Sequence, residues 1–489
     1  MLLTVEIGTS NFKSAVWDFN GNRLAYCSLP LSSVADGPHH EADPGQWLAA
    51  FAQCCAMLGN RGGGASGNNA ASAWTLGDVQ AIVISGNGPS LVPVLGGLDP
   101  AEGGIKTAAA RLWLDRRAEA AAGEISSLMG AYVDPSFFLP KILAIKNDEP
   151  DLYNQTRFFL GCPEFLAFSL TGQACSVFPA EGFDRWFWNE GVLGQLKLDP
   201  SKFPGFIAPT ETFGNLLPQP AARFGLKPDI PVISGGPDFF AAIVGAGVVR
   251  PGQVCDRSGT SEGINACTLR RISDSRLMSY GHPVKPFWNL SGIISTTGRA
   301  IEWGRGILGL QSYDEFFSLA ETAENSETCG GELPPIFLPY LAGERAPIWD
   351  PKARGVLRNL SLSSGRPEFA RAVLEGIGFA IRDVLSVMEE AGAEITELRT
   401  TGSAASSPVL NQIKADITGH EVLVPFHKEA ELLGLAIIGA YALGQFDSLA
   451  TAAFGLVQIE SRFQPNLQKA AFYTELFAEY RETYKKYPT

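Results

Sequence analysis

The sequence has few cysteines and histidines, and neither residue type occurs with the spacing of a metal site. Its eight cysteines include no C-x-x-C pair, and its five histidines show no mutual spacing of metal ligands. Because zinc sites and disulfide frameworks depend on such spacing, neither is expected. This cysteine usage fits a reducing compartment, so the expected location is the cytoplasm.

The sequence also lacks long apolar runs and clusters of positive charge. No uninterrupted run approaches the roughly 18 apolar residues of a membrane helix. The first ten residues, MLLTVEIGTS, have no basic region and reach a charge at Glu6, so we expect a buried strand there and no signal peptide. The formal net charge is −13, and no Lys/Arg cluster stands out. We therefore expect no membrane or nucleic-acid partner, but a small polar or phosphorylated substrate in a locally positive site.

A repeated tripeptide is the most informative feature that the sequence does contain. Gly-Thr-Ser occurs at Gly8–Ser10 and again at Gly259–Ser261, about half of the 489 residues apart. Each copy lies between two strand-like runs, so each is expected to be the corner of a β-hairpin that presents N–H groups and hydroxyls to an anion. One such corner is a weak signal. Two, in a chain long enough for two large domains, predict a phosphate clamp.

The two halves share one order of elements: hairpin, helix, strand, small-residue turn and helix. The elements expected in the first half are strands Leu2–Ile7, Lys13–Asp18 and Arg23–Leu29, a helix capped by Asp43, a mobile loop Asn60–Asn69, a strand Val79–Ser85, and a strand, Gly-Gly-Pro turn and helix over Ile230–Gly247. After the second hairpin, a helix Pro367–Ala391, a strand Glu397–Thr400 and a turn at Gly402 are expected. This α/β order is typical of actin-like or ribonuclease-H-like ATPases, whose two βββαβα domains face an interdomain cleft. The predicted domains are residues 1–244 and 245–489.

Asp238 has the setting of a catalytic carboxylate. It follows a strand-like run and a Gly-Gly-Pro turn, and it stands at the start of an apolar helix near the boundary between the halves. A helix N-terminus keeps such a carboxylate ionised, and it can then orient a substrate hydroxyl and accept its proton during phosphoryl transfer. An ordinary helix-capping Asp has the same position. The assignment therefore depends on the neighbouring candidates.

Those neighbours are a carboxylate and a lysine beside the first Gly-Thr-Ser corner. Lys13 can meet a terminal phosphate, and Glu6 can hold Mg²⁺ through water. Taken separately, a strand-end charge and a solvated strand residue explain them equally well. Taken together with the two corners, they predict a site for Mg-ATP.

From end to end, the chain resembles the FGGY family of carbohydrate kinases. The resemblance is carried by nine segments in order: EIGTSNFK, EADPGQW, LWLDRRAEA, LPKILAIKNDEPDLY, FLAFSLTG, GGPDFFAAIVGAG, SGTSEG, YLAGERAPIWDPKARG and TGSAASSPVLNQIKADITG. It implies an enzyme that uses ATP to phosphorylate a hydroxyl of a sugar, such as a pentulose or another ketose, or of a polyol. Mg²⁺ is the implied metal.

The resemblance also implies roles for individual residues. Asp238 is the implied catalytic base and, with Glu6, the implied metal-binding pair. The implied ATP-binding residues are Gly8, Thr9, Ser10, Lys13, Gly259, Thr260, Gly298, Gly402, Ser403, Ala404 and Asn411. The sugar pocket is expected to include Asn87, Gly88, Pro89, Trp113, Asp115, Arg116 and Phe239, although interior packing against a helix is the commoner explanation for a tryptophan. Glu344 and Arg345 are expected to brace the second domain.

The chain departs from the family pattern at positions that bear on specificity. Glu6 stands where the family usually has Asp, and Gly402-Ser403-Ala404 replaces a Gly-Gly-Gly turn. Members that phosphorylate xylulose carry Gln-Met-His where this chain has Asn87-Gly88-Pro89, and Asn where it has Phe239. Because lost polar partners change specificity sharply, we expect D-xylulose to be a poor substrate.

Two other classes of function stay open at this point. An actin-like or chaperone-like ATPase would turn over ATP without sugar, although it would not need the sugar-side segments LWLDRR and LPKILAIK. A degenerate member would bind sugar or nucleotide without turnover, as Glu6 and Phe239 suggest. The sequence leaves the sugar, the hydroxyl and the oligomeric state open, with a homodimer among the alternatives.

Overall fold

The structure is a computed structural model that describes residues 1–62, 74–96, 104–323 and 333–486. The chain splits into two compact units. Unit 1 comprises Met1–Ala241 and Glu431–Leu456, and unit 2 comprises Ala242–Ala430 and Val457–Thr489. The assignment of sugar binding to residues 1–244 and of ATP binding to residues 245–489 stays a prediction.

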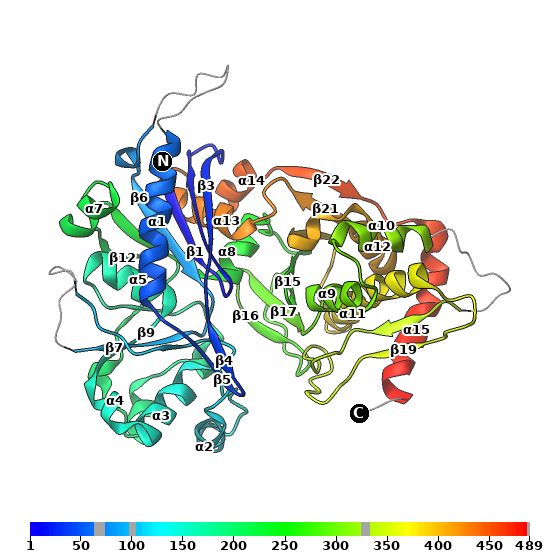
Figure 1. Cartoon of the computed structure of the whole chain (residues 1–489), viewed down its shortest axis with the longest axis horizontal. Coiled ribbons are helices and arrows are strands. Elements are labelled where there is room, and N and C mark those ends of the chain that lie inside the picture. Colours follow the sequence, from blue (N-terminus) through cyan, green and yellow to red (C-terminus); the bar gives the residue numbers. More distant parts are fainter. Residues whose placement is uncertain (63–73, 97–103, 324–332, 487–489) are drawn as a thin grey trace. The chain divides into compact units, whose positions relative to one another are not determined.

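Unit 1 is built on a six-stranded sheet (Figure 1). Its strands, in spatial order, are β12 (Thr212–Asn215), β13 (Pro231–Pro237), β6 (Ala81–Gly86), β1 (Leu2–Ile7), β2 (Asn11–Trp17) and β3 (Arg23–Pro30). β1, β2 and β3 form an antiparallel meander, whereas β1, β6 and β13 run parallel. Every residue of β1 and β6 is buried, as expected for parallel strands covered on both faces.

Helices from distant parts of the chain cover the two faces of this sheet. On the face that carries Leu3 and Ile82, the core includes residues of α1 (Gly45–Gly62) and α5 (Cys162–Thr171). Side chains alternate along a strand, so Leu2 and Val83 lie on the other face. There they contact Gly439 of α13 (Ala430–Ala442), where a Cβ atom would come within 2.6 Å of Val83. The absence of a side chain at Gly439 thus permits close packing of α13.

A second sheet of five short strands completes unit 1. Its order is β4 (Val34–Asp36), β5 (His39–Ala42), β8 (Ala110–Arg111), β7 (Leu91–Leu95) and β9 (Thr156–Gly161). The helices of this region are α2 (Glu119–Met129), α3 (Phe138–Asp148), α4 (Pro150–Gln155) and α6 (Glu190–Gln195). The remaining elements of unit 1 are a two-stranded parallel sheet of β10 (Ser176–Val177) and β11 (Phe206–Ile207), and the helices α7 (Pro218–Phe224) and α14 (Leu449–Leu456). The five-stranded sheet positions the loop that follows β6, because this loop leads into β7.

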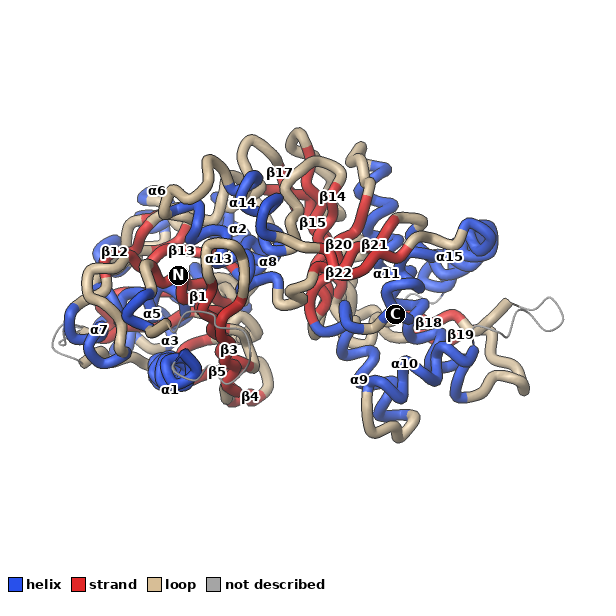
Figure 2. Tube along the Cα trace, turned by 90° about the horizontal axis from the view of Figure 1, so that it is seen from above, coloured by secondary structure: helices blue, strands red, loops and turns tan. Residues whose placement is uncertain are grey.

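Unit 2 repeats the order of unit 1 on a seven-stranded sheet (Figure 2). Its strands are β16 (Met278–Gly281), β17 (Trp288–Ile294), β15 (Glu262–Thr268), β14 (Gln253–Ser258), β20 (Glu397–Gly402), β21 (Glu421–Pro425) and β22 (Ile459–Phe463). β14, β20 and β21 run parallel, as β1, β6 and β13 do in unit 1. The duplication expected from the two Gly-Thr-Ser corners is therefore present in the fold.

The core of unit 2 lies between this sheet and its helices. The longest is α11 (Arg366–Glu390), which contacts α12 (Pro408–Thr418), α10 (Tyr313–Thr322) and α9 (Gly298–Ile307). β18 (Ile336–Leu338) contacts α11 and α15 (Ala470–Lys486), and it pairs with β19 (Val356–Arg358). α15 also contacts α12. α8 (Asp238–Gly245) begins in unit 1 and ends in unit 2.

Most expected elements occur within two residues of their predicted bounds, and three details differ. Gly235-Gly236-Pro237 is the last part of β13, not a separate turn, because a register shift lets the strand continue past Ser234. The first helix starts at Gly45, and the Asp43 carboxylate accepts a hydrogen bond from the Gly45 N–H at 2.8 Å. Of the expected loop 60–69, residues 60–62 belong to α1, and the rest lies outside the described residues.

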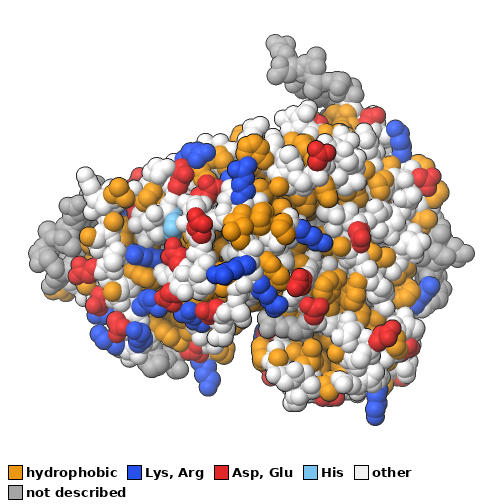
Figure 3. Space-filling model, turned by 180° about the vertical axis from the view of Figure 1, so that it is seen from behind, with side chains coloured by type: hydrophobic (Ala, Val, Ile, Leu, Met, Phe, Trp, Pro, Cys, Tyr) orange, Lys and Arg blue, Asp and Glu red, His pale blue; other side chains and the backbone are white. Residues whose placement is uncertain are grey.

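The surface carries charges of both signs. On the face shown in Figure 3, Lys and Arg side chains lie among Asp and Glu side chains. In the described ranges, no helix is both long enough and apolar enough to span a bilayer.

Candidate active site

In unit 1, parallel strands bring the predicted base and the predicted metal-binding carboxylate to the same edge of the sheet. Glu6 pairs with Ser85 near the end of β6, and Pro237, just before Asp238, pairs with Gly86. Neighbouring strands lie about 4.8 Å apart, so the ends of β1 and β13 are roughly 10 Å apart across β6. This edge, at the carboxyl ends of parallel strands, is where open α/β sheets bind ligands.

Asp238 is half-buried at the first position of α8. Its Oδ1 accepts a hydrogen bond from the Phe239 N–H at 2.7 Å, which holds the carboxylate at the helix start. The thiol of Cys162 lies close enough to sense this charge. Burial, followed by the charges of Glu164 and Asp238, raises the pKa of Cys162 well above its usual value.

The first corner, Gly8–Ser10, is a tight turn between β1 and β2. The Gly8 N–H donates to the Asn11 carbonyl at 2.9 Å, and a Cβ atom on Gly8 would lie 2.8 Å from that oxygen. Lys13 pairs with Glu6 across the two strands, with Nζ and Oε2 3.1 Å apart. Ser10 is exposed and Thr9 is half-buried.

The loop Asn87–Pro89 lies against the first corner. Asn87 donates from both its backbone N–H and its Nδ2 to the Ile7 carbonyl, at 2.8 and 3.0 Å. Ser90 donates to Asn87 Oδ1, and its Oγ accepts from the Trp113 N–H at 3.2 Å. The Trp113 indole donates to Thr9 Oγ1 at 2.8 Å. Trp113 is half-buried, and these hydrogen bonds from its two N–H groups join the loop to the corner.

Asp115 and Arg116 make contacts within the protein. Asp115 is fully buried, and its carboxylate accepts from Arg117 and from the His40 N–H at 2.9 Å. Burial opposes ionisation, but the hydrogen bonds and charge of Arg117 outweigh burial and hold the pKa of Asp115 below its usual value. Arg116 is exposed and pairs with Asp134 at 3.2 Å. Direct contact of either residue with sugar stays a prediction.

Phe239 belongs to an aromatic cluster beside the predicted base. Its ring stacks on Phe183 with centroids 6.2 Å apart and planes at 23°, and Phe183 also contacts Trp186. Phe183 and Trp186 belong to the aromatic-rich middle of the sequence. The residue after Asp238 therefore presents an apolar surface that packing holds in place.

In unit 2, the second corner Gly259–Ser261 is packed against two other predicted ATP-binding segments. The Gly298 N–H, at the start of α9, donates to the Gly259 carbonyl at 3.1 Å, and a Cβ on Gly298 would lie 2.2 Å from that oxygen. Gly402 ends β20 beside Ser258, and a Cβ there would lie 1.8 Å from the Ser258 carbonyl. Gly402 also has a positive φ of 84°. Glycine is therefore required at both positions.

The turn after Gly402 continues into α12. Ser403 is exposed and Ala404 half-buried in the short helix Ser403–Ser406. Asn411 is buried in α12, and its Nδ2 donates to the Ala405 carbonyl at 2.9 Å. The structure thus brings together Gly259, Gly298, Gly402 and the turn that Asn411 supports.

The sequence patterns did not predict a buried charged cluster that lies next to the second corner. Lys414 Nζ lies 2.6 Å from Asp256 Oδ2 and 2.5 Å from Glu262 Oε1, and all three side chains are buried. Burial and the nearby charge of Asp256 raise the pKa of Glu262 to about 8. A signal was present, because Lys414 interrupts the apolar stripe formed by Leu410, Ile413 and Ile417 of α12.

Glu344 supports the segment that leads into α9. Its Oε1 accepts from the N–H groups of Ser295 and Arg345, both at 2.7 Å. Ser295 precedes Gly298 by three residues. These contacts match a bracing role within unit 2.

Comparison with known proteins gives this site a family. Residues 1–245 match the N-terminal domain, and residues 257–443 the C-terminal domain, of the FGGY family of carbohydrate kinases. The chain belongs to that family. It is a carbohydrate kinase, its phosphoryl donor is ATP, and its substrate is a small sugar-like molecule.

Named relatives differ in the substrate they act on. The kinase is 27% identical to a xylulose kinase of Staphylococcus epidermidis, covering 99% of this chain and 97% of the relative. It is also 27% identical to a gluconokinase of Bacillus subtilis, over 69% of this chain and 70% of the relative. A ligand-bound xylulose kinase structure from Lactobacillus acidophilus aligns with a TM-score of 0.83 at 23% identity, covering 99% of this chain and 98% of that one. This confirms the actin-like α/β fold of both domains.

Proposed function

We propose that this kinase transfers the terminal phosphoryl group of Mg-ATP to a hydroxyl of a ketose or polyol, with Asp238 as the base. The observation that carries this proposal is the position of Asp238. It opens α8 at the sheet edge that also holds the first corner and the loop Asn87–Pro89. A hydroxyl bound against this loop would lie at the strand ends beside the carboxylate.

The proposed step is a direct displacement at phosphorus. The substrate oxygen forms a bond to the terminal phosphorus of ATP, the bond from that phosphorus to the bridging oxygen breaks, and ADP leaves. The hydroxyl proton passes to Asp238. Positioning and charge neutralisation supply most of the rate enhancement in such reactions, and a positioned base adds to it.

The ATP phosphates are assigned to the two Gly-Thr-Ser corners. In unit 1 these are Gly8, Thr9 and Ser10 with Lys13, and in unit 2 Gly259 and Thr260. The adenosine side is assigned to Gly298, Gly402, Ser403, Ala404 and Asn411. The lack of side chains at Gly298 and Gly402 supports this assignment, because it lets the start of α9 and the end of β20 pack directly against the second corner, which places these segments at one site.

Mg²⁺ is assigned to Glu6 and Asp238. In the ranges that the structure describes, no group of three or more His, Cys, Asp or Glu side chains could hold a metal. A Mg²⁺ ion here would therefore take most of its oxygen ligands from phosphates and water, which this ion commonly does. Glu6 Oε2 lies 3.1 Å from Lys13 Nζ, so Glu6 fits a role in which it holds the ion through a water molecule. The ion would neutralise phosphate charge.

The substrate preference is inferred from the side chains of the loop Asn87–Pro89 and from the residue next to the base. The loop presents Asn87, Gly88 and Pro89, of which only Asn87 has a polar side chain, and that side chain donates to the Ile7 carbonyl. Phe239 adds apolar surface next to Asp238. We therefore expect D-xylulose to be a poor substrate, and a ketose or polyol with another hydroxyl pattern, or with a deoxy carbon facing Phe239, to be better.

A substrate panel tests this function. We would measure ADP release and kcat/KM with pentuloses, hexuloses, deoxyketoses, polyols and gluconate, each with a sugar-free control. We expect sugar-dependent turnover, with D-xylulose ten- to a hundredfold below the best substrate, as about 1–3 kcal/mol for an unpaired hydroxyl implies. D-xylulose as the best substrate would contradict the loop assignment. Equal turnover without sugar would favour an actin-like ATPase.

A further inference from the structure

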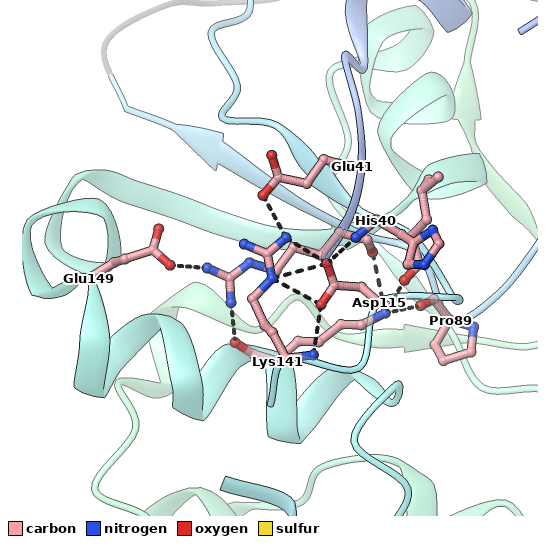
Figure 4. Close-up of polar contacts among 9 residues, drawn as sticks. His40, Glu41, Pro89, Asp115, Lys141 and Glu149 are labelled. Carbon is pink, nitrogen blue, oxygen red and sulfur yellow. Dashed lines mark hydrogen bonds and ion pairs between the residues drawn. The ribbon is translucent and has the colours of Figure 1, made fainter. Parts of the chain in front are cut away.

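Lys141 is a buried lysine bound to the backbone on which the predicted sugar site is built. It lies in α3, and its side chain is fully buried. Its Nζ donates to the carbonyl oxygens of Leu112 at 2.6 Å, Pro89 at 2.8 Å and Arg111 at 3.3 Å (Figure 4). An ammonium group has three N–H donors, so these three oxygens satisfy all of them.

The three carbonyls belong to two segments that are distant in the sequence. Pro89 ends the loop Asn87–Pro89, and Leu112 immediately precedes Trp113. One side chain from a third element therefore ties the loop to the Trp113 segment. Ser90 forms a second, uncharged link between them through Asn87 Oδ1 and the Trp113 N–H.

The surroundings of Lys141 make this link rigid. Burial lowers the pKa of Lys141 to about 7, while the charge of Asp115 favours its charged form. The nearby carboxylate of Asp115 is held by Arg117 and the His40 N–H (Figure 4). A buried charge is costly unless its hydrogen bonds are kept, so movement of Pro89 or Leu112 away from Nζ is disfavoured.

We propose that Lys141 is a positioning residue that fixes the loop Asn87–Pro89 against the Trp113 segment and thereby sets the affinity for the sugar. This inference rests on the proposed function, which assigns both segments to the sugar. Lys141 is buried beneath them and acts through their backbone.

Lys202 offers a matched control. It is also a buried lysine of unit 1, and its Nζ donates to the carbonyls of Thr156 and Asn154. Neither carbonyl belongs to a segment assigned to sugar. Lys202→Met thus removes the same kind of contact from the same unit at another place.

The test compares Lys141→Met with Lys202→Met using the best substrate of the wild-type enzyme. We would measure kcat, KM for sugar, KM for ATP, and sugar affinity by calorimetry without ATP. We expect Lys141→Met to weaken sugar binding and raise KM for sugar about 10- to 100-fold, the usual effect of a small displacement of a binding group, with KM for ATP nearly unchanged. Lys202→Met should lower the melting temperature without changing either KM.

An unchanged KM for sugar in Lys141→Met would overturn the inference, as would parallel changes in both KM values in both variants. If Lys141→Met does not fold, Ser90→Ala probes the same link without exposing a buried charge site, and it should raise KM for sugar alone. An unchanged value there would equally overturn the inference. Wild-type enzyme without sugar-dependent turnover would instead contradict the proposed function.

Discussion

Among the individual side chains, Glu6 gives the sharpest test of the metal assignment. It is buried at the end of β1 and pairs with Lys13 at 3.1 Å. Glu6→Gln removes one negative charge, so we expect a higher Mg²⁺ concentration for half-maximal rate, because the water shell of the ion loses an anionic partner. The measurement is initial rate against Mg²⁺ concentration. A wild-type Mg²⁺ curve would show that Glu6 has no part in binding the ion.

Glu6→Asp is the matched control for this variant. It keeps the charge and shortens the side chain by one methylene, which restores the residue usual in the family. An active variant with a wild-type Mg²⁺ requirement would separate charge from length. An inactive one would show that the site depends on the longer side chain.

The candidate site residues that could be predicted from the sequence are those defined by local patterns. Strand ends, Gly-rich corners and the start of an apolar helix can be located from neighbours in the chain, as for Glu6, Gly259 and Asp238. The partners of the buried lysines could not be found in this way. Lys141 bonds Pro89, 52 residues away, and Lys414 bonds Asp256, 158 residues away. Such contacts depend on how α3 and α12 pack.

The first turn of α5 contains a carboxyl group whose titration should affect stability. Burial raises the pKa of Glu164 from 4.5 to about 7. The unfolded chain loses this proton near pH 4.5, but the folded chain keeps it until about pH 7. The stability that the protonated group provides is therefore fully present below pH 4.5 and is lost as pH rises to 7, by about 3 kcal/mol in total.

Glu164→Gln should remove this pH dependence, because an amide stays neutral throughout. Urea unfolding at pH 5 and pH 8 is the measurement. We expect the stability of the variant relative to wild type to be about 2 kcal/mol more favourable at pH 8 than at pH 5. A difference that does not change with pH would show that Glu164 titrates normally.

Secondary structure followed the sequence closely where a single period or a run of apolar residues was present. β1 and α11 are examples, since each is specified by a continuous local pattern. The sequence could not place α13. Its residues AELLGLAIIGAYA are apolar on all sides, which indicates a buried helix but not the sheet that covers it. In the fold, Glu431–Leu456 belongs to unit 1, although β21 before it belongs to unit 2.

The proposed sugar residues all lie in unit 1, whereas the second corner and the proposed adenosine residues lie in unit 2, and this division makes a prediction for the whole enzyme. Lys414 binds Asp256 and Glu262 beneath the second corner, as Lys141 binds carbonyls beneath the loop Asn87–Pro89. Breaking such a buried ion pair costs about 3–5 kcal/mol of stability. We expect Lys414→Met to raise KM for ATP about tenfold by displacing this corner, with KM for sugar nearly unchanged.

The measurement is steady-state kinetics with each substrate varied in turn. Lys141→Met is the comparison, because we expect it to raise KM for sugar and not KM for ATP. A rise in KM for sugar but not for ATP in Lys414→Met would contradict the assignment of the second corner to ATP. The control is the melting temperature of both variants, which must lie above the assay temperature.

The most direct test of sugar phosphorylation with Asp238 as base is the turnover of Asp238→Asn. Asparagine keeps the shape of the side chain but cannot accept the proton. With the best substrate and saturating Mg-ATP, we predict kcat to fall roughly 10²- to 10⁴-fold, while sugar affinity by calorimetry stays near that of wild type. Turnover within a factor of a few of wild type would contradict the account.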